Sequence, residues 1–179
     1  TGVLVNIAIV KHSKTASGSN IAGQDSIAER KVQSSGFLID PAGIVVTNQH
    51  VIADAGEIVV TLQDGTRLGA SVMAAATHSD IALLKVNAHK RLPVVRFGDS
   101  DRLRPGDPIL VVGNPLGLGS TVTAGIVSAL ERVNPESEAG SFFQIDAPLN
   151  TGNSGGPVFS LDGEVIGIST AFLTAGGEG

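Results

Sequence analysis

The chain has 179 residues, of which 42% are hydrophobic, and a formal net charge of -5. This size and composition suit one compact unit with a substantial core. It contains no cysteine, tryptophan or tyrosine and shows no basic stripe, so we expect no disulfide framework, no thiolate metal site and no nucleic-acid binding. No apolar run approaches the ~20 residues that a membrane span needs.

The first half of the chain alternates short apolar runs with turn sequences. A β-branched run over residues 3–10 predicts a first strand. The polar stretch from His12 to Ser35 lacks periodicity and predicts a long mobile loop, with a short helical turn around residues 26–30. Further strands are predicted at residues 36–39, 44–47, 58–62, 67–76 and 81–86, with one helical turn after His50 and a hairpin turn at Asp64-Gly65.

The second half repeats this pattern after a polar, turn-rich seam at residues 88–107. Strands are predicted at residues 94–97, 108–112, 121–130, 142–145, 157–160 and 164–170, with Asp162-Gly163 as another hairpin signal. Many short strands with 23 glycines and 8 prolines between them favour an all-β fold built from antiparallel barrels or sandwiches.

A glycine-rich turn, Gly152-Asn153-Ser154-Gly155-Gly156, is the strongest chemical signal. Such a turn can expose one hydroxyl while successive backbone N–H groups point the same way. Acyl transfer needs this arrangement, a nucleophile beside donors aimed at a developing oxyanion. The alternative is a hairpin loop whose serine only bonds to backbone.

Two further residues fit a catalytic triad with Ser154. His50 follows an apolar strand at the start of a loop, and Asp80 stands immediately before the apolar run 81–86. Imidazole is a base with an ordinary pKa of about 6.5, and a carboxylate on its other nitrogen fixes the tautomer. The order histidine, aspartate, serine is that of chymotrypsin among three known orders.

These residues lie in motifs that together resemble the protease domain of the HtrA (Deg) family, from about Val3 to the last residue. The motifs are Ser35 to Asp40, Thr47 to Val51, His50 to Ala55, Asp80 to Lys85, Gly113 to Gly117 and Gly152 to Pro157. The resemblance implies one trypsin-like protease domain with a chymotrypsin-like double antiparallel β-barrel. The N-terminal barrel would cover about residues 1–90 and the C-terminal barrel about residues 105–179, with the active site in the cleft between them.

The resemblance also implies the role of each site residue. His50 would be the general base, Asp80 its orienter and Ser154 the nucleophile. The N–H groups of Gly152 and Ser154, with Asn153 between them, would form the oxyanion hole. The expected activity is a serine endopeptidase that degrades unfolded or misfolded polypeptides through an acyl-enzyme, without a cofactor. Because imidazole must be neutral to act as a base, we expect activity to rise through about pH 6–7.

A shallow apolar specificity pocket follows from the same resemblance. Pro148 stands six residues before Ser154, where a trypsin-like enzyme would carry aspartate at the pocket base. The pocket walls would be Leu149, Ala171, Phe172 and Leu173. We therefore expect cleavage after small or medium aliphatic residues.

Other polar segments carry weaker signals. His12, His78 and His89 are not grouped with carboxylates, so we expect no metal site. The glycine-rich segment 113–120 lacks the spacing of a phosphate-binding loop and by resemblance supports the active site. The resemblance also implies that the acidic loop 134–140 responds to bound peptide and helps to order the oxyanion turn. From its residues alone, this loop is interpreted as a solvated turn.

The resemblance extends to partners and compartment. Members of the family usually carry PDZ domains after the protease and assemble as trimers or multiples of trimers, and their commonest location is the bacterial periplasm. The family's closing strand and terminal helix would lie beyond Gly179. Two alternatives remain at this stage, a peptide-binding chaperone-like module with an inactive or latent triad and a non-proteolytic acyl hydrolase.

Overall fold

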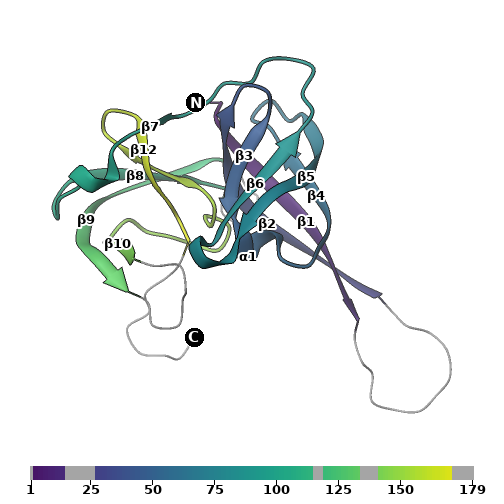
Figure 1. The fold of residues 1–179 in the computed structure, drawn as a ribbon, viewed down its shortest axis with the longest axis horizontal. Helices are drawn as coiled ribbons and strands as arrows, with labels where there is room; N and C mark the ends of the chain where they lie inside the picture. The colour runs from purple at the N-terminus through teal and green to yellow at the C-terminus, as the bar shows by residue number, and fades with distance from the viewer. Residues whose placement is uncertain (1, 15–26, 115–118, 134–140, 171–179) are drawn as a thin grey trace, which may run out of the picture.

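A closed barrel of six antiparallel strands forms the first half of the molecule (Figure 1). The computed structural model describes residues 2–14, 27–114, 119–133 and 141–170. Around the barrel the strand order is β1-β2-β3-β6-β5-β4. The strands are β1 (Leu4–Lys14), β2 (Ile27–Asp40), β3 (Ile44–Asn48), β4 (Ala55–Thr61), β5 (Arg67–Ala76) and β6 (Ile81–Val86). A single helical turn, α1 (Gln49–Ile52), follows β3, as predicted after His50.

A second sheet of six strands lies beside the barrel, in the order β10-β9-β8-β11-β12-β7 (Figure 1). Its strands are β7 (Arg96–Phe97), β8 (Pro108–Gly113), β9 (Thr121–Val133), β10 (Ser141–Ile145), β11 (Pro157–Ser160) and β12 (Glu164–Ile168). All its pairings are antiparallel except that of β12 with β7. Two 3₁₀ turns, η1 (Thr77–Ser79) and η2 (Ser100–Arg102), complete the described elements. None of the described helices is long and apolar enough to cross a membrane. The predicted all-β fold is confirmed.

The prediction of a long loop between His12 and Ser35 is wrong at both ends of this segment. Strand β1 continues to Lys14 and strand β2 already begins at Ile27, so the predicted helical turn around residues 26–30 is wrong as well. The two strands pair in continuous register from Leu4↔Phe37 to Lys14↔Ile27, and their hairpin extends away from the barrel (Figure 1). Two such strands satisfy each other's backbone groups, so the pairing does not need the apolar alternation that the prediction looked for. Residues 15–26 lie outside the described part of the chain.

Each half of the molecule has its own apolar core. In the barrel, β6 buries every second residue, the period of a strand with one face inward. Its inward residues Leu84 and Val86 are fully buried with Val5, Ile7 and Val60. The second sheet packs a smaller core, in which the buried residues are Ile109, Val111, Val127, Ala147, Val158 and Ile166.

A third apolar cluster joins the two halves. Phe37 and Val46 of the barrel pack there with Val95 and with Val165 of β12. Phe37 is fully buried and meets the ring of Phe97 edge-on, with 6.5 Å between the ring centroids. Residues from both halves are therefore held against each other by direct core packing.

The segment between the two sheets is also fixed to the barrel. Leu92 N and Val95 N donate hydrogen bonds to Pro41 O (3.1 Å) and Leu38 O (3.0 Å). At the tip of the β4–β5 hairpin, the Lys90 ammonium donates a hydrogen bond to Asp64, at 2.6 Å, and holds the pKa of that carboxyl well below its usual range. Both side chains are exposed, so the ion pair adds little to stability, and backbone hydrogen bonds and core packing hold the segment.

Candidate active site

His50 lies two residues beyond the end of β3, the strand that leads out of the barrel core. It is the second residue of α1, which begins directly after β3. The next two residues, Val51 and Ile52, are buried in the barrel core, which anchors the helical turn. The side chain of His50 is 48% exposed, so its ring reaches solvent from a fixed backbone.

Asp80 is held in an unusual backbone conformation beside α1. It ends η1 with φ 52° and ψ 38°, the left-handed region, which aspartate tolerates better than most residues. Its carbonyl oxygen accepts hydrogen bonds from Gln49 N at 3.1 Å and from Asn48 Nδ2 at 2.9 Å. The start of α1 therefore fixes Asp80 independently of its carboxylate.

The structure brings the predicted base and its orienter together. His50 Nδ1 lies 2.7 Å from Asp80 Oδ2, and His50 N donates to Asp80 Oδ1 at 2.9 Å. With Nδ1 engaged by the carboxylate, Nε2 is the ring nitrogen left to exchange a proton with another group. This is the pairing that an activated hydroxyl needs behind its base.

A threonine from the second half of the molecule completes the environment of this carboxylate. Thr170, two residues beyond the end of β12, donates its hydroxyl to Asp80 Oδ2 at 2.6 Å. Asp80 and Thr170 are 90 residues apart in the chain, and a threonine after a strand is common. The sequence therefore offers no signal for this contact, which was not predicted.

Ser154 lies in the turn between β10 and β11. The preceding turn closes with a hydrogen bond from Asn153 N to Asn150 O at 3.0 Å. Gly152, its third residue, has φ 102°, the positive value that a type II turn requires. In a type I turn the peptide between the two central residues is rotated, so the N–H of the third residue faces the other way.

The turn that carries Ser154 is docked onto the barrel. Ser35 N and Ser34 Oγ both donate to Ser154 O, at 3.0 Å and 2.6 Å. A Cβ atom added at Gly155 would lie 2.3 Å from both Ser35 O and Thr47 Oγ1. Since β3, the strand of Thr47, leads directly into α1, Ser154 is brought to the same region as His50 and Asp80.

Within residues 152–156, the N–H groups of Gly152 and Ser154 have no protein acceptor in the described part of the chain. The others are engaged, with Asn153 N bonded to Asn150 O, Gly155 N to Ser169 O and Gly156 N to Asn153 O. Asn153, named with the expected oxyanion hole, therefore uses its own N–H inside the turn. Its side chain is buried.

Most of the predicted specificity pocket lies outside the described residues. Leu149 is partly buried against the second core, whereas Ala171, Phe172 and Leu173 are not described, nor is the loop 134–140. The described start of segment 113–120 contacts both β2 and the Ser154 turn. Asn114 N donates to Ser35 Oγ at 2.8 Å, and a Cβ atom at Gly113 would lie 2.4 Å from Asn153 Oδ1.

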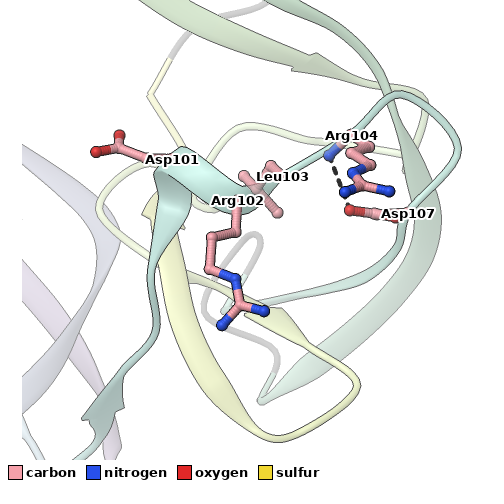
Figure 2. Close-up of a pocket in the computed structure, with 5 residues that line it drawn as sticks. All are labelled: Asp101, Arg102, Leu103, Arg104 and Asp107. Atoms are coloured by element: carbon pink, nitrogen blue, oxygen red, sulfur yellow. Dashed lines mark hydrogen bonds between the residues drawn. The ribbon is translucent and has the colours of Figure 1, made fainter.

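Other polar clusters in the described chain do not form a second site. No group of three or more histidine, aspartate or glutamate side chains there could hold a metal ion. A pocket at the η2–β8 turn is lined by Arg102 and Arg104 among other residues (Figure 2). The two guanidinium groups point in different directions, and Arg104 N donates to Asp107 Oδ2 at 2.8 Å. Their positions do not form a fork for one anion.

Residues 34–168 match the protein family described as "Trypsin-like peptidase domain". Over 151 residues the chain is 52% identical to a probable periplasmic serine endoprotease DegP-like of Brucella suis, covering 83% of this chain and 29% of that protein. A relative of the same description from Rickettsia conorii is 43% identical over 159 residues, which cover 87% of this chain and 31% of that protein. The chain thus spans about three tenths of the length of these curated relatives.

Solved structures with a similar fold include HtrA-type proteases. A variant of the HtrA-type protease AlgW with decapeptide has a TM-score of 0.86 and 32% identity, covering 98% of this chain and 57% of that chain. AlgW with tripeptide has a TM-score of 0.80 and 34% identity, covering 93% of this chain and 50% of that chain. The similarity therefore extends over both halves of the described fold.

Proposed function

The chain belongs to the trypsin-like peptidase domain family, in its HtrA (Deg) branch, and on this premise we propose that it is a serine endopeptidase. In this proposal Ser154 is the nucleophile, His50 the general base and Asp80 the residue that orients the base. The observation that carries the proposal is the His50 Nδ1–Asp80 Oδ2 pair at 2.7 Å, together with the hydrogen bonds that hold the Ser154 turn on β2 of the same barrel.

Each catalytic step has a residue for it. As Ser154 Oγ attacks the scissile carbonyl, His50 Nε2 takes the proton of the hydroxyl. His50 later gives that proton to the leaving amine. The carboxylate of Asp80 stabilises the imidazolium formed between these events. Water then attacks the acyl-enzyme in the same way, and Ser154 is regenerated.

The oxyanion of the tetrahedral intermediates would be held by Gly152 N and Ser154 N. Neither group has a protein acceptor among the described residues, and the φ of 102° at Gly152 supports an orientation of its N–H away from the Asn150 carbonyl. Donors fixed before the reaction need no reorganisation as charge develops. Removing one such donor typically lowers kcat by a factor of about 10²–10³.

The proposed specificity is for small or medium aliphatic residues before the cleaved bond. Leu149 is apolar and packs on the second core, which supports an apolar wall. The proposed partners of that wall are Ala171, Phe172 and Leu173. A peptide library cleaved after lysine or arginine would contradict this assignment.

The biological setting proposed is protein quality control in the bacterial periplasm. The relatives are named as periplasmic serine endoproteases, and the AlgW structures contain peptides. We propose unfolded or misfolded polypeptides as substrates. A homotrimer or a multiple of trimers, with at least one PDZ domain beyond Gly179, is the proposed assembly of the whole protein.

Casein digestion by the intact protein and by a Ser154→Ala variant tests the proposal. We expect the wild type to cleave casein and the variant to lose at least about 10³-fold in rate, because the nucleophile is gone. Sequencing the products reads the cut sites. A fluorophosphonate probe should label the wild type at Ser154, and an undiminished rate in Ser154→Ala would refute the mechanism.

A further inference from the structure

A buried serine of the first barrel contacts the proposed oxyanion turn through its hydroxyl. Ser35 lies on β2 and is fully buried. Its Oγ donates to Gly152 O at 2.7 Å and accepts from Asn114 N at 2.8 Å. One hydroxyl therefore connects the barrel, the turn and the segment after β8.

This hydrogen bond acts on the peptide group that follows Gly152. The carbonyl oxygen of that peptide is held by Ser35 Oγ, and its N–H, which belongs to Asn153, is held by Asn150 O at 3.0 Å. Because a peptide group is planar and rigid, two opposite hydrogen bonds fix its orientation. The peptide plane on the C-terminal side of Gly152 is thereby fixed, and the backbone torsions of Gly152, with φ at 102°, then define the direction of its N–H relative to that plane.

We propose that Ser35 is a positioning residue that holds the Gly152–Asn153 peptide, so that the N–H groups of Gly152 and Ser154 face one oxyanion. The proposal rests on the proposed function and assigns a positioning residue to its oxyanion hole. Ser35 does not touch the substrate. It acts through the backbone of Gly152.

The hydroxyl has a role that neighbouring groups do not duplicate. Ser154 O is already held by Ser35 N and Ser34 Oγ, whereas Gly152 O has Ser35 Oγ as its hydrogen-bond donor in the described chain. Replacing Ser35 with alanine leaves Gly152 O and Asn114 N buried without this partner, which favours rearrangement of the turn. Cysteine keeps a similar shape but offers only a weak donor.

Kinetics of Ser35→Ala and Ser35→Cys in the intact protein provide the first test. We expect kcat on a peptide substrate to fall about 10- to 100-fold with KM within about threefold, because the turn is required in the transition state more than in the ground state. Affinity for a peptide boronate, which forms a tetrahedral adduct, should fall by a similar factor.

A matched control is Thr123→Val on β9. Its Oγ1 is also buried but has no hydrogen-bond partner within the described residues, so removing it should leave kcat and KM unchanged. Thermal unfolding of each variant, with kinetics measured well below its Tm, separates lost positioning from lost folding.

Amide hydrogen exchange in a Ser154→Ala background provides a readout that does not depend on activity. Ser35→Ala should speed exchange at Asn153 and Asn114 by about tenfold or more. Asn114 N loses its acceptor, and Asn153 N loses the fixed orientation of its peptide group. Exchange at Gly155, whose N–H donates to Ser169 O at 2.8 Å, should not change.

The outcomes separate the two proposals. If the wild type neither cleaves casein nor reacts with the fluorophosphonate, the proposed function fails, and so does the positioning role that rests on it. If the wild type is active and Ser35→Ala and Ser35→Cys keep its kcat, the positioning role alone fails. It also fails if kcat falls while exchange at Asn153 stays as in the parent, because the hydroxyl then acts elsewhere.

Discussion

At the scale of single residues, Asp80 combines several constraints. Its carboxylate accepts from His50 N, faces His50 Nδ1 and accepts from Thr170 Oγ1, while its carbonyl is held by Asn48 and Gln49. Its side chain is 18% exposed. Burying a carboxylate without such partners would cost folding free energy. Here the partners come from both halves of the molecule.

The substitution Asp80→Asn tests the orienting role at this residue. Asparagine tolerates the left-handed backbone conformation, so we expect the variant to fold. Its amide would favour the wrong tautomer of His50, and kcat should fall about 10⁴-fold, as when the orienting carboxylate of a chymotrypsin-like protease is replaced. Circular dichroism and peptide hydrolysis measure the two effects. A loss smaller than tenfold in a folded variant would remove Asp80 from the mechanism.

At the scale of elements, the close contact of β2 with its neighbours requires a glycine at position 36. A Cβ atom there would lie 2.7 Å from Ile7 Cδ1 on β1 and 2.8 Å from Val46 O on β3. Gly69 on β5 is different, because a Cβ atom there would have no atom within 4 Å. The two positions form a matched pair within one barrel.

Alanine at these two positions should have different effects on the free energy of unfolding. We expect Gly36→Ala to lower it by about 1–3 kcal/mol, because neighbouring strands must move to admit the methyl group. Gly69→Ala should leave it unchanged or raise it by up to about 1 kcal/mol, because alanine has less backbone freedom to lose on folding. Urea unfolding measures both. Equal effects would contradict the close packing of β2.

At the scale of the whole molecule, the proposed chemistry depends on how the halves are joined. His50 and Asp80 belong to the barrel, and Ser154 and Thr170 to the second half. The cluster around Phe37 and Val165 fixes their relation by packing. Phe37 follows Ser35 by two residues on β2, so the same strand supplies the interface core and the contacts to the Ser154 turn.

Comparing Phe37→Ala with Leu84→Ala tests this dependence. Leu84 is also fully buried but belongs to the barrel core. Phe37→Ala should lower the free energy of unfolding by about 3–5 kcal/mol and Leu84→Ala by about 2–5 kcal/mol. Only Phe37→Ala should reduce kcat per folded molecule, because it loosens the joint between the halves. Phe37→Leu, a milder change, should show the same direction. Equal kcat values per folded molecule would argue against coupling through this cluster.

The sequence by itself determined the all-β class, nearly every strand and the candidate residues His50, Asp80 and Ser154. These signals are local, since a strand with one buried face alternates every second residue and turns such as Asp64-Gly65 need particular residues. A glycine-rich turn around a serine is equally readable. Most of the strand boundaries agree within two or three residues.

Only the tertiary structure decided which polar residues hold these candidates in place. The hairpin of β1 and β2 was missed because strand pairing can hold polar sequences that lack apolar alternation. Ser34, Ser35 and Thr170 contact groups 90 to 120 residues away, and no local pattern encodes such a partner. The two N–H groups left without an acceptor depend on the backbone torsion at Gly152. A glycine permits that torsion, but the contacts of the folded chain select it.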